Sequence, residues 1–328
     1  MRGPADIDPW DQYASLAHSD GRGRTVALPP AYGPEAAEPF AALSPCDSLA
    51  AAMEPSLREW IRRGLADGAL PGRTEASLWA DALRHQMALR RGLPAEPLWH
   101  GPRGRERAWI LDLAAFVEPD LTVATGALAR AVAAAVTALE IAGPPDPLRP
   151  VAVVPGNLAG ALMAALVPYA WPEGRATAAA LVGVVLGAAA EASAALAIRL
   201  GPCPAWTERR AVVLRRLEAA IDALPSGAER GLATASQAAL ERALAAARRS
   251  GLRNLGLVGM RPACLVERLL GADSSAEAPV PSIIRFVDGP DGRPRRRLID
   301  PARRAIAALG LDPVSEGAAI AHIAGHGT

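Results

Sequence analysis

The chain has 328 residues, of which 51% are hydrophobic, so it is long enough to bury one large core or two smaller ones. Its 35 basic residues are all arginine and face 34 acidic residues, which gives a formal net charge of +1. A near-neutral chain lacks the positive field that attracts nucleic acid, so no DNA or RNA binding is expected. The absence of lysine excludes Schiff-base chemistry and a lysine phosphate clamp.

The cysteine pattern and the apolar runs indicate a cytoplasmic protein. Cys46, Cys203 and Cys264 are an odd number at wide spacing, which argues against a disulfide framework and favours a reducing compartment. The first residues carry acids and prolines where a signal peptide has an apolar run, so export is not expected. Residues 176–190 are the longest uncharged apolar run, shorter than the roughly 20 residues of a spanning helix, so no membrane association is expected.

No metal site is expected either. His322 and His326 have the spacing of two ligands on one helical turn, but Gly325 and Gly327 end a helix there. Neither a carboxylate nor a cysteine accompanies the two histidines, so surface histidines are the better interpretation.

The first elements in chain order are an irregular lead-in and two helices. Residues 1–50 are rich in Pro, Gly and Ala without a sustained period, which predicts an irregular or partly disordered segment. Apolar spacing predicts helices over 56–68 and 74–92, each ending at a glycine. The Pro- and Gly-broken stretch 93–107 follows and marks the main boundary.

After this boundary the pattern predicts a helix-rich α/β fold. Residues 108–117 form an apolar run that periodicity leaves open between a strand and a short buried element. Long helical patterns and then three apolar, β-branched runs follow. The helices are expected over 122–143, 173–201, 207–224 and 227–251, and the strands over 254–260, 281–287 and 295–299.

From about residue 106 onward, a series of segments resembles the C-terminal part of the ribonucleotide reductase large (catalytic) chain, in the family's order. The first two matches are "RPVAVVPGNLAGALM" with the family's R-P-x-G-L-G-Y-A-N-L-G-A-L-L-M, and "PY" with "EGRA" with its P-Y and E-G-R-A. Next come "LGPCP" with L-G-P-F-P, "GLRN" with G-L-R-N, and "MRPACLV" with A-P-T-G-T-I. The last are "SSAEAP" with S-S-G-I-E-P and the final "GHGT" with G-H-G-[ST]. The chain's only two asparagines, Asn157 and Asn254, both fall inside these segments. The likeness is closest to the cobalamin-dependent class.

The resemblance implies part of a ten-stranded α/β barrel over residues 106–328, preceded by a divergent N-terminal region over 1–105. The family's first barrel strands have no recognisable counterpart here. A barrel without them leaves unpaired strand edges, which favour association. We therefore expect the N-terminal region, a second copy in a homodimer, or another reductase chain to cover that edge. We also expect residues 254–260, 281–287 and 295–299 to share one sheet system.

The residues for the family's radical chemistry are missing. The family carries its radical cysteine in an N-x-C-x-E loop, and counting back from "WILDLAAFV" without gaps places that loop on residues 93–97. Leu93, Ala95 and Pro97 then stand where Asn, Cys and Glu are required. The second redox cysteine falls on Glu106.

Two further positions complete the candidate site. Cys46, in "SPCDS", is the alternative candidate for a catalytic cysteine, although this register needs a long insertion and puts Ser48 where the family has Glu. The phosphate loop, P-T-G-T in the family, has lost its glycine and both hydroxyls, which would have bound the anion. The vestigial nucleotide-binding residues that the resemblance implies are Pro262, Ala263, Cys264, Leu265, Ser274 and Ser275.

The expected function is that of a ribonucleotide reductase-like pseudoenzyme that binds a protein partner or, weakly, a nucleotide. We expect no cofactor, since adenosylcobalamin is implied by the family resemblance alone. The first alternative is an active, cobalamin-dependent ribonucleoside-diphosphate reductase component in deoxyribonucleotide synthesis, completed by another chain. The second is a helical scaffold whose likeness to the family is due to chance.

Overall fold

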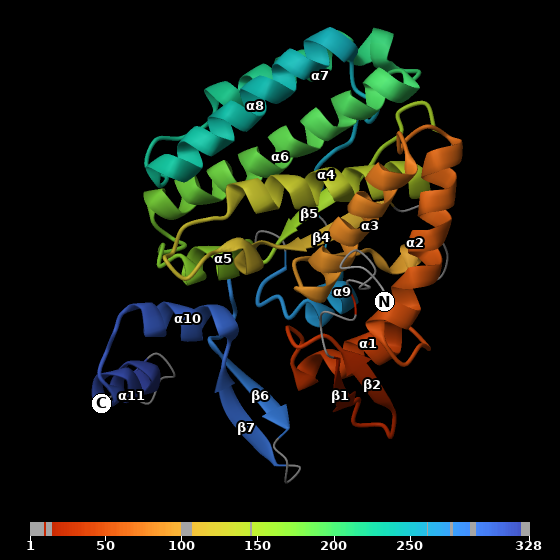
Figure 1. The fold of residues 1–328 in the computed structure, drawn as a ribbon. Coiled ribbons are helices and arrows are strands. Elements are labelled where there is room, and N and C mark those ends of the chain that lie inside the picture. The colour runs from red at the N-terminus through yellow and green to blue at the C-terminus, as the bar shows by residue number, and fades with distance from the viewer. Residues whose placement is uncertain are drawn as a thin grey trace.

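The computed structural model describes residues 10, 15–99, 107–144, 146–260, 262–275, 278–288 and 293–322. At its centre is a three-stranded sheet in the order β3 (Gly92–Pro94), β4 (Ala108–Asp112) and β5 (Ala152–Gly156). β3 runs antiparallel to β4, whereas β4 and β5 are parallel (Figure 1). All five residues of β4 are buried, as expected for a strand covered on both faces.

The segment Asn254–Gly259 lies beside β5 as extended backbone rather than as a regular strand. Val153 donates its N–H to Leu257 O at 2.9 Å, and Gly259 donates to Val153 O at 3.1 Å, in a parallel arrangement. The prediction of a strand over 254–260 is therefore wrong in form, although the segment is not helical and does extend the sheet. Gly256 and Gly259 give a reason, because glycine has no side chain to pack on a sheet face.

Four long helices form layers over one side of this sheet (Figure 1). α4 packs against α6, which packs against α8, with α7 beside α8. A Cβ atom at Gly187 of α6 would lie 2.6 Å from the backbone carbon of Ala239, so only glycine allows this close approach. The prediction of a buried helix over 176–199 is confirmed. The bounds are α4 Thr125–Ala142, α6 Pro172–Leu200, α7 Trp206–Asp222 and α8 Arg230–Ser250.

Two of these helices, α4 and α6, are long and apolar enough to cross a membrane by length and composition alone. α6 is longer than the apolar run 176–190 suggested, because flanking residues continue the helix on both sides. The most apolar windows of α4 and α6 are 56% and 67% buried inside the protein. Such burial is typical of core helices, so their hydrophobicity is weak evidence for a membrane.

The N-terminal region is more ordered than its composition predicts. β1 (Leu16–Ser19) and β2 (Thr25–Leu28) form an antiparallel hairpin, followed by the short helix α1 (Ala37–Leu43). Val26, Tyr32 and Phe40 are fully buried, so the prediction of an irregular lead-in over 1–50 is wrong for its described part. Apolar residues separated by turns pack into one core here without any sequence period that reveals them.

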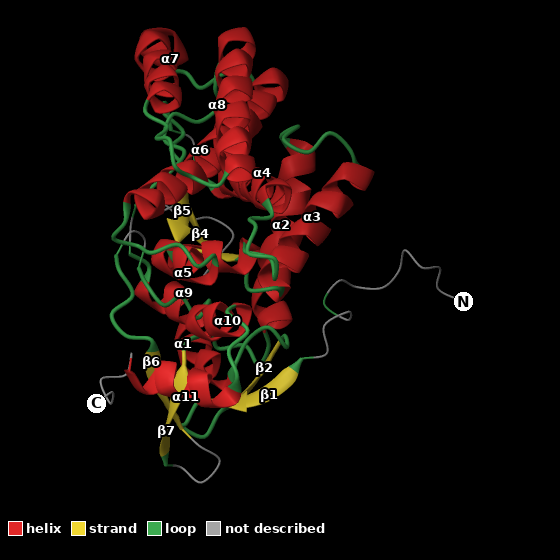
Figure 2. Cartoon of the chain, turned by 90° about the vertical axis from the view of Figure 1, so that its left-hand side faces the viewer, coloured by secondary structure: helices red, strands yellow, loops and turns green. Residues whose placement is uncertain are grey.

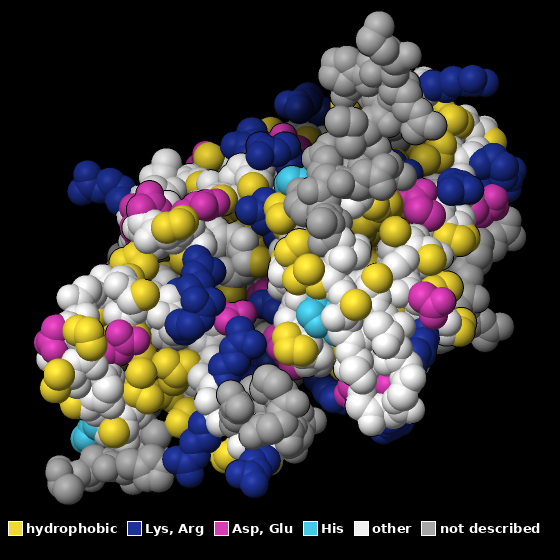
Figure 3. All heavy atoms as spheres, turned by 60° about the horizontal axis from the view of Figure 1, so that its bottom comes forward, with side chains coloured by type: hydrophobic (Ala, Val, Ile, Leu, Met, Phe, Trp, Pro, Cys, Tyr) yellow, Lys and Arg dark blue, Asp and Glu magenta, His cyan; other side chains and the backbone are white. Residues whose placement is uncertain are grey.

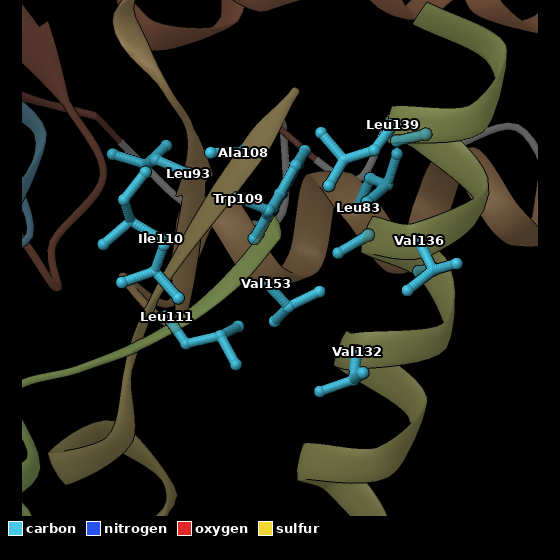
Figure 4. Packing of buried hydrophobic residues seen from close by; sticks show 14 of the residues in the cluster. Leu83, Leu93, Ala108, Trp109, Ile110, Leu111, Val132, Val136, Leu139 and Val153 are labelled. Atoms are coloured by element: carbon cyan, nitrogen blue, oxygen red, sulfur yellow. The ribbon is translucent and has the colours of Figure 1, made fainter. Parts of the chain in front are cut away.

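Two longer helices follow, and one of them packs with α4 around the side chain of Trp109. α2 (Leu49–Ala66) and α3 (Arg73–Ala88) agree with the predicted helices, except that α2 begins earlier, at a cap where Ser48 Oγ accepts from Ala51 N at 3.1 Å. Trp109 of β4 points between Leu83 of α3 and Leu139 of α4 (Figure 4). Much of the stretch that separates 1–105 from 106–328, residues 100–106, lies outside the described residues.

A short helix, α5 (Leu158–Ala164), follows β5, and the last third of the chain adds α9 (Cys264–Leu269) and a C-terminal unit (Figure 2). In this unit β6 (Ile284–Asp288) and β7 (Pro294–Leu298) pair antiparallel, and α10 (Asp300–Ala308) and α11 (Pro313–Ala321) follow. The two predicted strands exist, but they form a hairpin of their own instead of joining the central sheet. Within the described residues, no sheet closes into a barrel.

Candidate functional site

Polar side chains meet at the carboxyl ends of β4 and β5, where α/β folds usually bind ligands. Asp112 is the last residue of β4, and Asn157 directly follows β5. Asn157 Nδ2 donates to Asp112 Oδ1 at 2.8 Å, and Asn157 Oδ1 accepts from Asp273 N at 3.1 Å. One amide side chain thus connects the two strand ends to the loop that follows α9.

The backbone of Asn157 is specialised for this position. Its φ of 54° and ψ of 38° lie in the left-handed region, which asparagine tolerates better than most residues. The preceding Gly156 lies close to β4, since a Cβ there would be 2.6 Å from Leu111 O. The pair Gly156–Asn157 therefore lets the chain turn sharply from β5 into α5 while the amide faces Asp112.

A cavity of about 290 Å³ opens at this end of the sheet. Its lining combines acids with arginines from separate elements: Arg90, Arg91, Asp112, Asn157, Asp273, Asp300, Arg303 and Arg304. Figure 3 shows the face that carries α10 and the two hairpins, with arginine and acidic side chains interspersed across its middle. Several of these arginines already have partners: Arg304 donates to Ala114 O at 3.0 Å, and Arg303 lies 3.3 Å from Asp300.

Burial weakens the acidity of two carboxyls in this site. Burial raises the pKa of Asp112, and the nearby charge of Arg90 only partly opposes it. Burial also raises the pKa of Asp273 to about 6, although Arg285 Nη2 lies 2.7 Å from its Oδ1. A carboxyl with such a pKa exchanges its proton near neutral pH, so the site offers an acid–base group without a nucleophile beside it.

The vestigial phosphate loop is occupied by the chain's own carboxylate. Ala263 precedes α9, and its N–H donates to Glu267 Oε2 at 3.2 Å. Ser275 Oγ donates to the same carboxylate at 2.9 Å. The buried Glu267 side chain thus accepts from a backbone N–H and a hydroxyl of the predicted phosphate loop. The sequence did not predict that Ala263 and Ser275 would both donate hydrogen bonds to Glu267.

The other predicted loop residues are spread over different environments. Pro262 and Cys264 are exposed, and Leu265 is half-buried on α9. Ser274 is buried, and its Oγ has no hydrogen-bond partner in the described part of the chain. None of the predicted loop residues lines the 290 Å³ cavity, whose nearest member in sequence is Asp273.

The cysteines lie apart from this cavity. Cys46 is half-buried in the loop between α1 and α2, Cys203 is buried before α7, and Cys264 is exposed at the start of α9. None of the three lines a cavity described here. Burial raises the pKa of the Cys203 thiol, which makes it less nucleophilic.

The residues aligned with the radical loop lie at the opposite end of β4. Ala95 is buried, and its N–H donates to Ala108 O at 2.9 Å, at the amino end of the strand. The five residues of β4 separate it from Asp112 by about 13 Å at roughly 3.3 Å per residue. Leu93 is buried in β3, Pro97 is half-buried, and Glu106 lies outside the described residues.

Sequence reasoning missed Asp112, Asp273 and Arg90 as members of a site. A signal existed for Asp112, because a lone acid that ends a buried apolar strand is a candidate for the strand's carboxyl end. Among the described residues, no group of three or more metal-ligating side chains comes together. His322 is exposed just after α11, and His326 lies outside the described residues.

Comparison with known families identifies one match. The family described as ribonucleotide reductase, barrel domain, matches residues 121–285, about half of the chain. The match begins just before α4 and ends in β6, so it includes β5, Asn157, the extended segment 254–259 and the loop after α9. No curated protein matches the chain.

Proposed function

The chain belongs to the ribonucleotide reductase large-chain family, and we propose that it is a member without radical chemistry that acts by binding. The observation that carries this proposal is the position of Ala95. Aligned with the family's radical cysteine, it has a methyl group in place of a thiol and is buried against β4. A methyl group has no sulfur and no thiol hydrogen to lose, so Ala95 cannot carry a thiyl radical.

The sheet supports a second part of the proposal, which concerns the family's barrel. We propose that β4, β5 and the segment 254–259 correspond to part of the family barrel, left open. The N-terminal region contributes β3 to one edge of this sheet, which agrees with the expectation that residues 1–105 cover an edge. The partner we propose is a second copy of the chain or another reductase chain, in the cytoplasm.

The residues present do not fit a role for adenosylcobalamin, which the cobalamin-dependent class uses to form its thiyl radical. Such a role needs a cysteine beside the substrate, and no cysteine lines the cavity at the carboxyl ends of β4 and β5. Cys46, the alternative candidate, lies near Arg24, whose guanidinium donates to the Cys46 carbonyl rather than to the thiol. We therefore propose that the chain needs no cofactor.

Ribonucleotides should bind weakly at the vestigial loop. The loop has lost two hydroxyl donors, and Glu267 places a carboxylate where a phosphate would sit. Each charge-assisted hydrogen bond is worth about 1.5–3 kcal/mol, so losing two weakens binding by roughly a hundredfold or more. The repulsion between Glu267 and a phosphate adds to this loss.

A reductase assay tests the proposal. The purified chain, given adenosylcobalamin, a dithiol and each ribonucleoside diphosphate, should form no deoxyribonucleotide above background, alone or with native cell extract. Activity of the chain alone that disappears in Cys46→Ala would overturn the proposal. Activity that appears only when the chain is added to the extract would favour the alternative, a reductase completed by another chain.

A further inference from the structure

A second cavity, of about 560 Å³, lies at the amino ends of the parallel segments, away from the site above. α2, the end of α4 and the residues that lead into β5 and the segment 254–259 form its walls. The charged residues that line it are Arg62, Arg63, Asp67, Glu140, Arg149 and Arg253. Four arginines thus face two acids around one opening.

Three arginines gather here because of the topology. Arg107, Arg149 and Arg253 each precede one of the three parallel segments, β4, β5 and 254–259. Parallel segments begin at the same edge of a sheet, so the side chains before them meet. Their common neighbour is Glu140, near the end of α4.

Glu140 is already shared by three donors. Its Oε1 accepts from Arg149 Nε at 2.7 Å and from Arg253 Nε at 2.9 Å. Its Oε2 accepts from Asn254 Nδ2 at 2.8 Å. One carboxylate, 3% exposed, therefore serves two guanidinium groups and an amide.

Arg107 is the third guanidinium and has no such partner. It is 6% exposed, and its Nη1 has no hydrogen-bond partner among the described residues. It packs against Gly143 in the cavity wall, where a Cβ atom would overlap the guanidinium. Burial lowers the pKa of Arg107, and the charge of Arg149 adds to this, while Glu140 opposes it. A buried donor without an acceptor costs free energy that an anion in this place would recover.

We propose that this cavity binds a small molecule carrying a phosphate or diphosphate group. Guanidinium groups bind phosphate oxygens in pairs, and those lining the cavity come from α2 and from the residues before β5 and the segment 254–259, with Arg107 packed against Gly143 of the wall. Ala66, Ile141 and Leu200 provide an apolar wall for the organic part of the ligand. The volume lies within the roughly 300–1,000 Å³ of small-molecule sites. This inference does not depend on the proposed function, because it uses neither the position aligned with the radical cysteine nor the loop residues 262–265.

Binding here would connect the N-terminal region to the sheet. Arg62 and Arg63 belong to α2, whereas Arg149 and Arg253 precede β5 and the segment beside it. Arg62 is held by Glu59, with its Nε 2.7 Å from Glu59 Oε2, on the exposed side of α2. A bridging anion would attract both groups and stabilise the folded chain by an amount that grows with the logarithm of its concentration above Kd.

Calorimetric titration with inorganic pyrophosphate tests the site, with ADP and adenosine as comparison ligands. We expect pyrophosphate and ADP to bind and to raise the melting temperature, and adenosine to do neither. The double variant Arg62→Gln/Arg63→Gln and the single variant Arg107→Gln should each weaken pyrophosphate binding by at least about tenfold. Arg215→Gln, on the exposed face of α7, is the matched control and should bind like the wild type.

Two results would overturn the proposal. One is the absence of any pyrophosphate binding or thermal shift in the wild type at millimolar concentration. The other is binding that the α2 double variant leaves unchanged, which would place the anion elsewhere, for example at the vestigial loop. If Arg107→Gln does not fold, the α2 variant decides, because Arg62 is a largely exposed residue whose replacement leaves the core intact.

Discussion

The two ends of the central sheet bury charged groups of opposite sign, and they differ in how these groups are paired. At the carboxyl end, Asp112 and Asp273 are buried and less acidic than usual, and Asn157 ties them together. At the amino end, Arg149 and Arg253 both donate hydrogen bonds to a single carboxylate, Glu140, which also accepts one from Asn254. The end where α/β enzymes bind their ligands keeps the smaller cavity, beside residues that the chain's own hydrogen bonds connect, while the opposite end keeps the larger cavity.

This difference teaches where binding capacity survives when a catalytic residue is lost. At the carboxyl end, the chain's own groups satisfy each other, as Glu267 does for Ala263 and Ser275. The amino end keeps a cavity beside its shared carboxylate, Glu140. Its arginines are held by the start of each parallel segment, so the frame itself keeps them together.

The largest effect is expected from breaking the amino-end cluster. Replacing Glu140 with Gln removes the one negative charge between Arg149 and Arg253 and leaves two guanidinium groups facing each other at low exposure. Breaking a buried ion pair by removing one partner costs about 3–5 kcal/mol, so the free energy of unfolding should fall by that amount. Denaturant titration followed by circular dichroism measures it.

An exposed pair serves as the control for this variant. Glu191 and Arg242 lie 3.3 Å apart with both side chains about half exposed, so Glu191→Gln should cost at most about 1 kcal/mol. If the free energy of unfolding falls equally in the two variants, Glu140 contributes no more to stability than a surface charge does.

A smaller effect, and one that depends on pH, is expected at the carboxyl end. Folding raises the pKa of Asp273 from its ordinary value of 3.8 to about 6, mainly through burial. The folded chain therefore keeps this proton to higher pH than the unfolded chain, and its stability falls as the pH rises through that window. Between about pH 4 and pH 7, the wild type should lose about 1–3 kcal/mol relative to Asp273→Asn.

The exposed Asp120 gives the control with the opposite sign. Hydrogen bonds from Thr122 lower its pKa, so its contribution to stability is present above the ordinary pKa and is lost as the pH falls. Parallel unfolding curves for the wild type and Asp273→Asn at every pH would contradict the assignment of a buried, weakly acidic carboxyl.

The sequence predicted the long helices well and the sheet poorly. α6 was predictable because its small residues and terminal glycine and proline are local signals. The segment 254–259 was not, because its form depends on the register with β5 and on two glycines that weaken a strand. The hairpin of β1 and β2 was missed because the apolar residues that bury it, such as Val26 and Tyr32, are separated by turns.

The site residues that belong to family motifs could be predicted from the sequence. The contacts between residues far apart in the chain could not. Asn157 and Ser275 were singled out by the family resemblance, and both have polar partners in the fold. Asp112 and Asp273 lie far apart in the chain and meet because Asn157, after β5, bonds both to the carboxylate that ends β4 and to the loop after α9. The position of Glu267 at the phosphate loop could not be inferred either, since a helical glutamate usually faces solvent.

The measurement that tests the central claim most directly is cleavage of adenosylcobalamin by the purified chain, followed by its visible absorption spectrum. The chain is mixed with the cofactor, a dithiol and a ribonucleoside diphosphate under anaerobic conditions. With Ala95 in place of the radical cysteine, the spectrum should stay that of the intact cofactor throughout the incubation. Cleavage that requires both the chain and the nucleotide, and that Cys46→Ala or Cys264→Ala abolishes, would contradict the loss of radical chemistry.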